Sequence, residues 1–172
     1  MMNFKRYFLA SSVLLSVICS GPALVVAQDF ATVLAGAELT RVVPPGFYFQ
    51  GLSAPTQMRN AAAARFGSKR YVVAGLVDTS GYAADVRAKY EGFFITDSPI
   101  TINGSELATG AYGFGLSDSG KMQILDLAGN QILSVSTTND SALKRPRPLM
   151  MMRAVNGIRF YYGKDFVTIA AK

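Results

Sequence analysis

Short apolar runs separated by turn residues fill the chain from residue 70 onward, and this pattern limits the possible folds more than any other feature. The runs hold four to seven residues rich in Val, Ile, Phe and Tyr, and the breaks include Asn103-Gly104, Asp118-Ser119-Gly120 and Asn156-Gly157. Such runs joined by Asn-Gly and Asp-x-Gly turns are typical of antiparallel hairpins. We therefore predict a mainly β fold, either a sandwich or a small closed barrel of about eight short strands.

The apolar runs give the expected positions of the strands, to which a short aromatic run after Pro44-Pro45-Gly46 is added. In chain order they cover residues 47–49, 71–77, 91–95, 99–102, 111–116, 121–127, 131–136, 149–153, 158–162 and 166–170. The segment 140–148 carries three cations interleaved with two prolines and is predicted to be an exposed loop or an edge.

A single helix is predicted over residues 55–66. Ser53 can cap it, Pro55 suits its first turn, the Ala-rich run 61–64 favours helix, and Gly67 supplies a stop. At helical spacing Met58 and Phe66 share a face, so we expect them to anchor the helix against a sheet.

The first 27 residues have the order of a secretory signal peptide. Lys5 and Arg6 precede an uncharged apolar run, Gly21-Pro22 interrupts it, and Val25-Val26-Ala27 offers small residues for cleavage. The alternatives are a retained membrane anchor or lipid attachment at Cys19. Cleavage predicts an exported protein, periplasmic or extracellular, without a transmembrane span after processing.

Removal of residues 1–27 from the 172-residue chain leaves 145 residues, which is the size of one domain. We therefore predict a single β-rich domain over residues 28–172, in which 28–45 is an irregular lead-in and residues 29–37 form either a short helix or an unstructured stretch.

The composition excludes several chemistries. The chain contains no histidine, and its single cysteine lies in the predicted leader, so Ser-His-Asp triads, Cys-His pairs and imidazole metal sites are excluded. We expect no metal and no cofactor. Without Lys5 and Arg6 of the leader, fifteen basic and eleven acidic residues remain, and a net charge of +4 is too small to indicate a nucleic-acid-binding protein.

A polar stretch after the predicted strand 71–77 is the first candidate site. Asp78, Ser80 and Tyr82 could bind a ligand, and with Asp85 nearby the stretch could form a carboxylate-dependent hydrolase. The simpler interpretation is an Asx-turn, in which the Asp78 carboxylate accepts backbone N–H groups.

Aromatic residues suggest a second candidate site. Tyr112, Phe114, Phe160 and Tyr162 would line an apolar cavity if the fold were a closed barrel with these strands adjacent, and the protein would then carry a small apolar ligand.

Two groups of cations suggest a third site, for an anionic polymer, a lipid headgroup or an acidic envelope protein. The first group surrounds the predicted helix and the second lies in the proline-rich loop; together they comprise Arg59, Arg65, Lys69, Arg70, Lys144, Arg145 and Arg147. Ordinary solvated surface is the alternative.

The run Gly115 to Lys121 matches the first seven positions of a phosphate-binding loop, but Met122 replaces the required Ser or Thr, and a strand pattern follows instead of a helix. We interpret it as a hairpin turn.

The stretch Ile102 to Leu127, with Ile-Asn-Gly and then Thr109-Gly110-Ala111-Tyr112 before a hairpin, resembles small exported bacterial β-domains of unknown function. The resemblance implies a β-rich exported domain and no catalytic residues. The sequence thus favours a non-enzymatic exported domain that acts by binding or as an envelope component.

Overall fold

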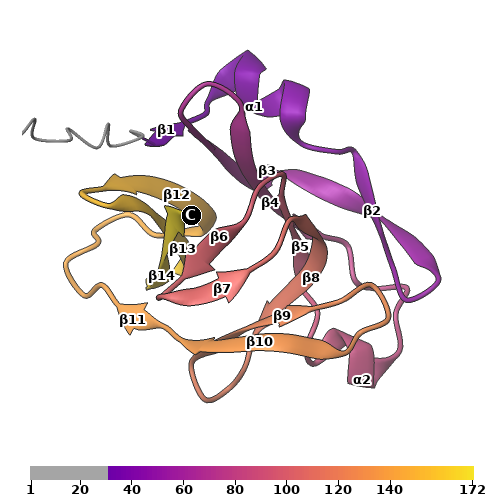
Figure 1. The fold of residues 1–172 in the computed structure, drawn as a ribbon. Coiled ribbons are helices and arrows are strands. Elements are labelled where there is room, and N and C mark those ends of the chain that lie inside the picture. Colours follow the sequence, from indigo (N-terminus) through magenta and orange to yellow (C-terminus); the bar gives the residue numbers. More distant parts are fainter. Residues whose placement is uncertain (1–30) are drawn as a thin grey trace, which may run out of the picture.

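The computed structural model describes residues 31–172. The predicted leader, residues 1–27, lies outside this range. From residue 31 onward, fourteen strands and two short helices form two antiparallel sheets (Figure 1). The sheets are separate and face each other as a β-sandwich, which decides between the two predicted architectures: there is no closed barrel within residues 31–172. The chain also forms more strands than the predicted eight.

The larger sheet has eight strands in the order β1-β3-β4-β5-β8-β9-β10, with β2 paired to β3 outside this path. Its strands are β1 (Ala31–Val33), β2 (Gly46–Phe49), β3 (Leu52–Phe66), β4 (Arg70–Val77), β5 (Gly92–Thr96), β8 (Gly110–Leu116), β9 (Lys121–Leu125) and β10 (Gln131–Ser136).

The smaller sheet has six strands in the order β12-β13-β14-β6-β7, with β11 paired to β14. Its strands are β6 (Ile100–Ile102), β7 (Ser105–Leu107), β11 (Thr138–Asn139), β12 (Arg147–Ala154), β13 (Gly157–Gly163) and β14 (Asp165–Ala171). The loop before β12 is exposed and β12 is an end strand, which confirms the prediction for segment 140–148.

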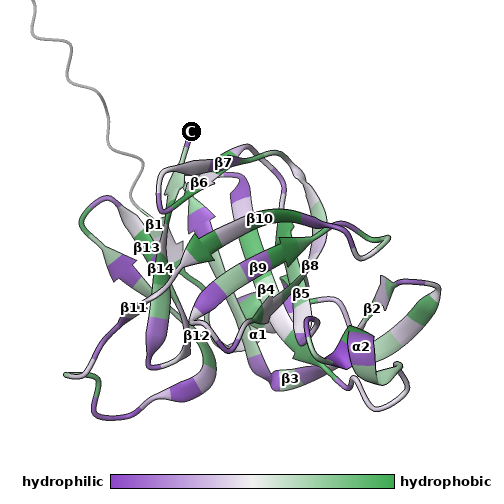
Figure 2. Cartoon of the chain, turned by 90° about the horizontal axis from the view of Figure 1, so that it is seen from below, coloured by the Kyte–Doolittle hydropathy of each residue, from purple (hydrophilic) through white to green (hydrophobic). Residues whose placement is uncertain are grey.

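The main core lies between the two sheets. Phe160 of β13 meets Phe94 and Phe114 of the larger sheet edge-on, with ring centroids 5.6 Å apart in each pair. All three side chains are buried. Along the strands, hydrophobic segments alternate with hydrophilic or neutral ones (Figure 2), as expected where inward and outward side chains alternate.

A second core covers the outer face of the larger sheet. Phe47 and Phe49 of β2 pack there with Tyr82 and Tyr90, and Leu34 and Val43 at the two ends of α1 (Gly36–Val42) join the same cluster. Phe49 and Tyr90 are stacked with centroids 3.9 Å apart. The central strands of this sheet are therefore buried on both faces, which requires continuous apolar runs instead of alternation.

The predicted helix over residues 55–66 is wrong, because this segment is part of the 15-residue strand β3. Ala62 and Ala64 face the sheet–sheet core, whereas Ala61 and Ala63 face the second core. Small side chains on both faces suit a strand covered from both sides, and this packing overrides helix propensity. Met58, predicted to be an anchor, is 40% exposed.

An irregularity divides β3 into two parts. Thr56 pairs with Val77 and Ala61 pairs with Gly75, so residues 57–60 bulge from the sheet. The Gln57 side chain donates to the Val77 carbonyl (3.0 Å), and Asn60 donates to Gln57 (2.8 Å). The first part of β3 can then pair with β2, while the second pairs with β1 and β4.

Strand β3 also holds the segment that precedes β2, residues 31–45, against the larger sheet. β1 pairs with the end of β3, the Leu34 N–H donates to the Ala63 carbonyl (2.9 Å), and α1 follows directly. Neither alternative for residues 29–37 describes this segment: strand β1 occupies Ala31–Val33, and helix α1 begins only at Gly36. The second helix, α2 (Ala84–Arg87), is a single turn between β4 and β5. Neither helix is long and apolar enough to cross a membrane, and no other helix occurs after residue 30.

Candidate functional site

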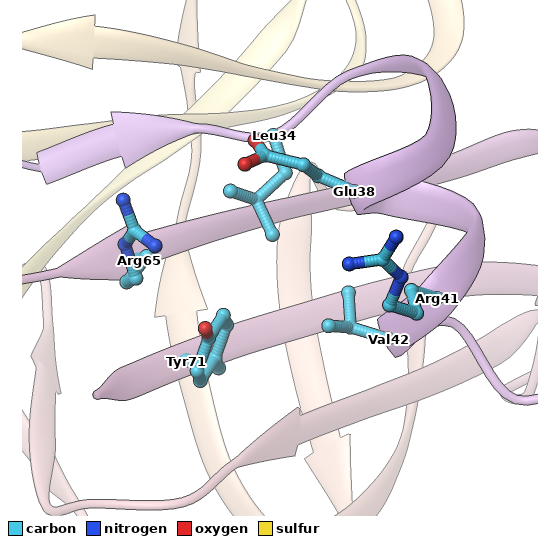
Figure 3. A pocket seen from close by; sticks show the side chains of 6 residues that line it. All are labelled: Leu34, Glu38, Arg41, Val42, Arg65 and Tyr71. Carbon is cyan, nitrogen blue, oxygen red and sulfur yellow. The ribbon is translucent and has the colours of Figure 1, made fainter. Parts of the chain in front are cut away.

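A pocket of about 170 Å³ lies between α1 and the outer face of the larger sheet. It is lined by Leu34, Glu38, Arg41, Val42, Arg65 and Tyr71 (Figure 3). Leu34 and Val42 supply apolar surface, and the other four bring charged or hydroxyl groups. Arg65 and Tyr71 rise from β3 and β4, while Glu38 and Arg41 extend from α1 (Figure 3).

Strand register places Arg65 and Tyr71 side by side. They are directly paired residues of β3 and β4, so their side chains project from the same face. This face is the outer one, because Ala61 and Ala63 precede Arg65 at alternate positions and belong to the outer core. Arg65 is therefore a charge at the end of an apolar row.

One nitrogen of the Arg65 guanidinium is buried and would normally donate a hydrogen bond. This nitrogen, Nε, has no acceptor within the described part of the chain. A buried donor without an acceptor costs about 1–3 kcal/mol, so an acceptor entering the pocket would recover this energy. With Arg41 and Glu38, the pocket lining carries a formal charge of +1.

Arg65 is the one cation of the predicted patch that lies in the pocket. Arg59 lies in the β3 bulge, Lys69 in the exposed turn after it, and Arg70 donates to the Lys172 carbonyl at 3.3 Å. Lys144, Arg145 and Arg147 lie in or next to the exposed loop before β12, in the other sheet's part of the chain.

The Asp78 stretch forms the turn that the simpler interpretation describes. The Asp78 carboxylate accepts the Ser80 N–H (3.0 Å), and this hydrogen bond lowers the pKa of Asp78. Tyr82 turns inward, where its hydroxyl donates to the Leu52 carbonyl (2.8 Å). Asp85 is exposed in the first turn of α2, whereas the Asp78 carboxylate is engaged by Ser80.

The four aromatic residues of the second candidate site lie on facing sheets and not on adjacent strands. Tyr112 and Phe114 belong to β8, and Phe160 and Tyr162 to β13. Phe114 and Phe160 fill the core between the sheets. The Tyr112 hydroxyl donates to the Ala108 carbonyl (3.0 Å), whereas Tyr162 is half-buried near Glu91.

Glu91 and Tyr162 form a partly buried pair contributed by the two sheets. Burial raises the pKa of the Glu91 carboxyl, against the opposing influence of the Tyr162 hydroxyl and the Leu116 backbone. Burial and the nearby carboxylate raise the pKa of Tyr162 to about 12. The Glu91 Oε2 is buried without a hydrogen-bond partner among residues 31–172.

The run Gly115 to Lys121 is a hairpin turn between β8 and β9, as predicted. The Gly120 N–H donates to the Ser117 carbonyl, and the Ser117 N–H donates to the Lys121 carbonyl, each at 2.9 Å. Among residues 31–172, no three His, Cys, Asp or Glu side chains are grouped so that they could hold a metal ion.

Sequence reasoning missed five of the six pocket residues. The sequence pattern predicts Arg65 only as part of a surface patch and gives no signal for Glu38, Arg41 or Tyr71. The one sequence feature that points to the pocket is that the charged Arg65 directly follows the apolar run 61–64. The pairing with Tyr71 and the position of α1 depend on the tertiary structure.

Comparison with known proteins adds no assignment: no family model, no curated protein and no solved structure matches the chain.

Proposed function

We propose that the protein is an exported, non-enzymatic β-sandwich domain that binds a small organic anion in the pocket between α1 and the larger sheet. The observation that carries the proposal is that Arg65 lines this pocket while its buried Nε has no hydrogen-bond partner within residues 31–172. Export rests on the signal-peptide order of residues 1–27.

A carboxylate is the group that suits these donors. A guanidinium offers parallel N–H donors that match the two oxygens of a carboxylate, and the Tyr71 hydroxyl from the neighbouring strand is a further donor. Leu34 and Val42 favour a short apolar tail. The pocket volume of about 170 Å³ is below the roughly 300–1,000 Å³ of pockets for drug-sized ligands, so the ligand is small.

Isothermal titration calorimetry with butyrate as the probe tests the proposal. We expect butyrate to bind and butyramide, which has nearly the same shape without the charge, to bind at least tenfold more weakly. Arg65→Met should weaken butyrate binding about ten- to hundredfold, because a hydrogen bond to a charged group contributes about 1.5–3 kcal/mol.

Arg59→Met is the matched control. It removes the same charge from the same strand, but from the exposed bulge, and should leave the affinity unchanged. Equal binding of butyrate and butyramide, or equal losses in the two variants, would contradict a carboxylate site at Arg65.

A further inference from the structure

Two Asn-Gly pairs of the described chain lie in different surroundings. Asn103-Gly104 forms the turn between β6 and β7, and Asn156 lies in the turn between β12 and β13, directly before Gly157. Asparagine is chemically labile, above all before glycine, whose lack of a side chain lets the backbone nitrogen approach the asparagine amide. Both asparagines are exposed, so access to water does not distinguish them.

Asn103 is held by three hydrogen bonds to two other segments. Its N–H donates to the Thr168 carbonyl (2.8 Å), and its side-chain oxygen accepts the Thr168 N–H (2.7 Å). Its side-chain nitrogen donates to the Ser136 carbonyl at the end of β10 (2.8 Å). Both polar atoms of the Asn103 amide are therefore fixed, and a reaction at its carbon would first have to break these hydrogen bonds.

Asn156 has no such contacts. Within residues 31–172 no hydrogen bond holds its side chain, and its neighbour Val155 is 91% exposed. The pair formed by Ala154 and Gly157 is the last of the β12–β13 ladder. Because the end of a hairpin opens at little cost in free energy, the Gly157 nitrogen can reach the Asn156 side chain.

The three remaining asparagines of residues 31–172 each donate a side-chain hydrogen bond, and none of them precedes glycine. They are Asn60, which donates to Gln57 (2.8 Å), Asn130, which donates to Asp126 (2.9 Å), and Asn139, which donates to Asp165 (2.9 Å). In this part of the chain only Asn156 both precedes glycine and keeps an amide without a hydrogen bond.

We propose that Asn156 is a site of spontaneous deamidation in the folded protein. The Gly157 nitrogen attacks the Asn156 side-chain carbon and forms a C–N bond. The side-chain nitrogen leaves as ammonia and takes up the proton that the Gly157 nitrogen loses. Water then adds to either carbonyl of the resulting succinimide and opens the ring to aspartate or isoaspartate. No electron is transferred, and water is the only co-reactant.

Peptide mapping by mass spectrometry after incubation of the folded protein tests the proposal. Trypsin releases Asn156 in the peptide 154–159 and Asn103 in the peptide 90–121, so one digest reports both sites. We expect Asn156 to convert at least tenfold faster than Asn103. Isoaspartate should be among the products, because it forms only through the succinimide.

Incubation of the same protein in guanidinium chloride is the control for the role of the fold. Unfolding removes the hydrogen bonds of Asn103, so the two sites should then convert at similar rates. If Asn103 stayed tenfold slower in the denaturant, its protection would be local, and the assignment from the fold would be wrong.

Asn156→Gln is the matched variant. Glutamine would have to close a larger ring, which forms much more slowly, so conversion in the peptide 154–159 should be lost while this exposed substitution leaves the stability nearly unchanged. Gly157→Ala is unsuitable, because a Cβ at Gly157 would overlap the Ile169 carbonyl.

Three results would overturn the proposal. The first is equal conversion of Asn156 and Asn103 in the folded protein. The second is an Asn156 that stays intact in the folded protein while it converts in the denaturant. The third is conversion to aspartate without isoaspartate, which would indicate direct hydrolysis and not attack by the Gly157 nitrogen.

Discussion

At the scale of single residues, four buried side-chain atoms within residues 31–172 lack a hydrogen-bond partner: Thr56 Oγ1, Arg65 Nε, the Tyr90 hydroxyl and Glu91 Oε2. Two of them belong to ionisable groups with separate consequences. Arg65 lines a pocket and its Nε lacks an acceptor, which makes this guanidinium a candidate for ligand binding. The Oε2 of Glu91 is buried near the junction of the two sheets, beside Tyr162. We therefore attribute a binding role to Arg65 and expect the effect of Glu91 to be on stability.

Glu91→Gln should stabilise the protein at neutral pH. Because burial raises the pKa of Glu91 in the folded state, folding favours the protonated carboxyl. Stability from this group is fully present below the pKa of the unfolded chain and falls as the pH rises through the folded pKa. Each unit between the two pKa values corresponds to about 1.4 kcal/mol.

Urea denaturation of the unaltered protein and Glu91→Gln at pH 4 and pH 7 measures this effect. The gain of the variant should be larger at pH 7 than at pH 4, because glutamine does not ionise. A constant difference between the two proteins across this range would be inconsistent with a raised pKa at Glu91.

At the scale of elements, strand β3 shows how packing selects a conformation that the local sequence does not favour. Its Ala61–Ala64 run is buried on both faces, by the sheet–sheet core and by the second core under α1 and β2. Alanine is the strongest helix former, so this strand owes its conformation to its neighbours β1, β2 and β4.

A synthetic peptide spanning residues 53–67 should therefore be helical in trifluoroethanol. Removed from β1, β2 and β4, the segment keeps its Ala-rich helix propensity, its cap at Ser53 and its stop at Gly67. Circular dichroism should show helix in the alcohol, while a scrambled peptide with proline in the alanine run should not. A β spectrum under the same conditions would show that the strand preference is local.

At the scale of the whole molecule, Phe160 links the two sheets through two ring contacts between their facing strands. Phe160 is the only member of the smaller sheet in the ring contacts with Phe94 and Phe114 within residues 31–172. Since it packs against two strands of the other sheet, its removal should affect the molecule as one cooperative unit.

Phe160→Ala should reduce the free energy of unfolding by about 3–5 kcal/mol. The measurement is denaturant unfolding followed by tyrosine fluorescence and by circular dichroism, which should give coincident transitions. Met152→Ala, at a side chain that is 43% exposed, should cost much less. Similar losses in the two variants, or separate transitions for the two signals, would show that the sheets are not coupled through Phe160.

The sequence by itself determined the β-rich class, the turns and most strand positions. Hairpins depend on local information: Asn103-Gly104 and Asn156-Gly157 turn because glycine adopts a positive φ, +82° and +130° respectively, and the flanking runs are β-branched or aromatic. The exposed position of segment 140–148 follows equally from its prolines and cations.

Only the tertiary structure decided the sandwich, the conformation of β3 and the pocket. A continuous apolar run fits a buried helix or a doubly covered strand equally well, and only the layers above and below it distinguish them. Arg65, Tyr71 and Arg41 are brought together by strand register and by the path of α1 across the sheet. Such long-range pairing leaves no local periodicity, so the candidate site could not be predicted from the sequence.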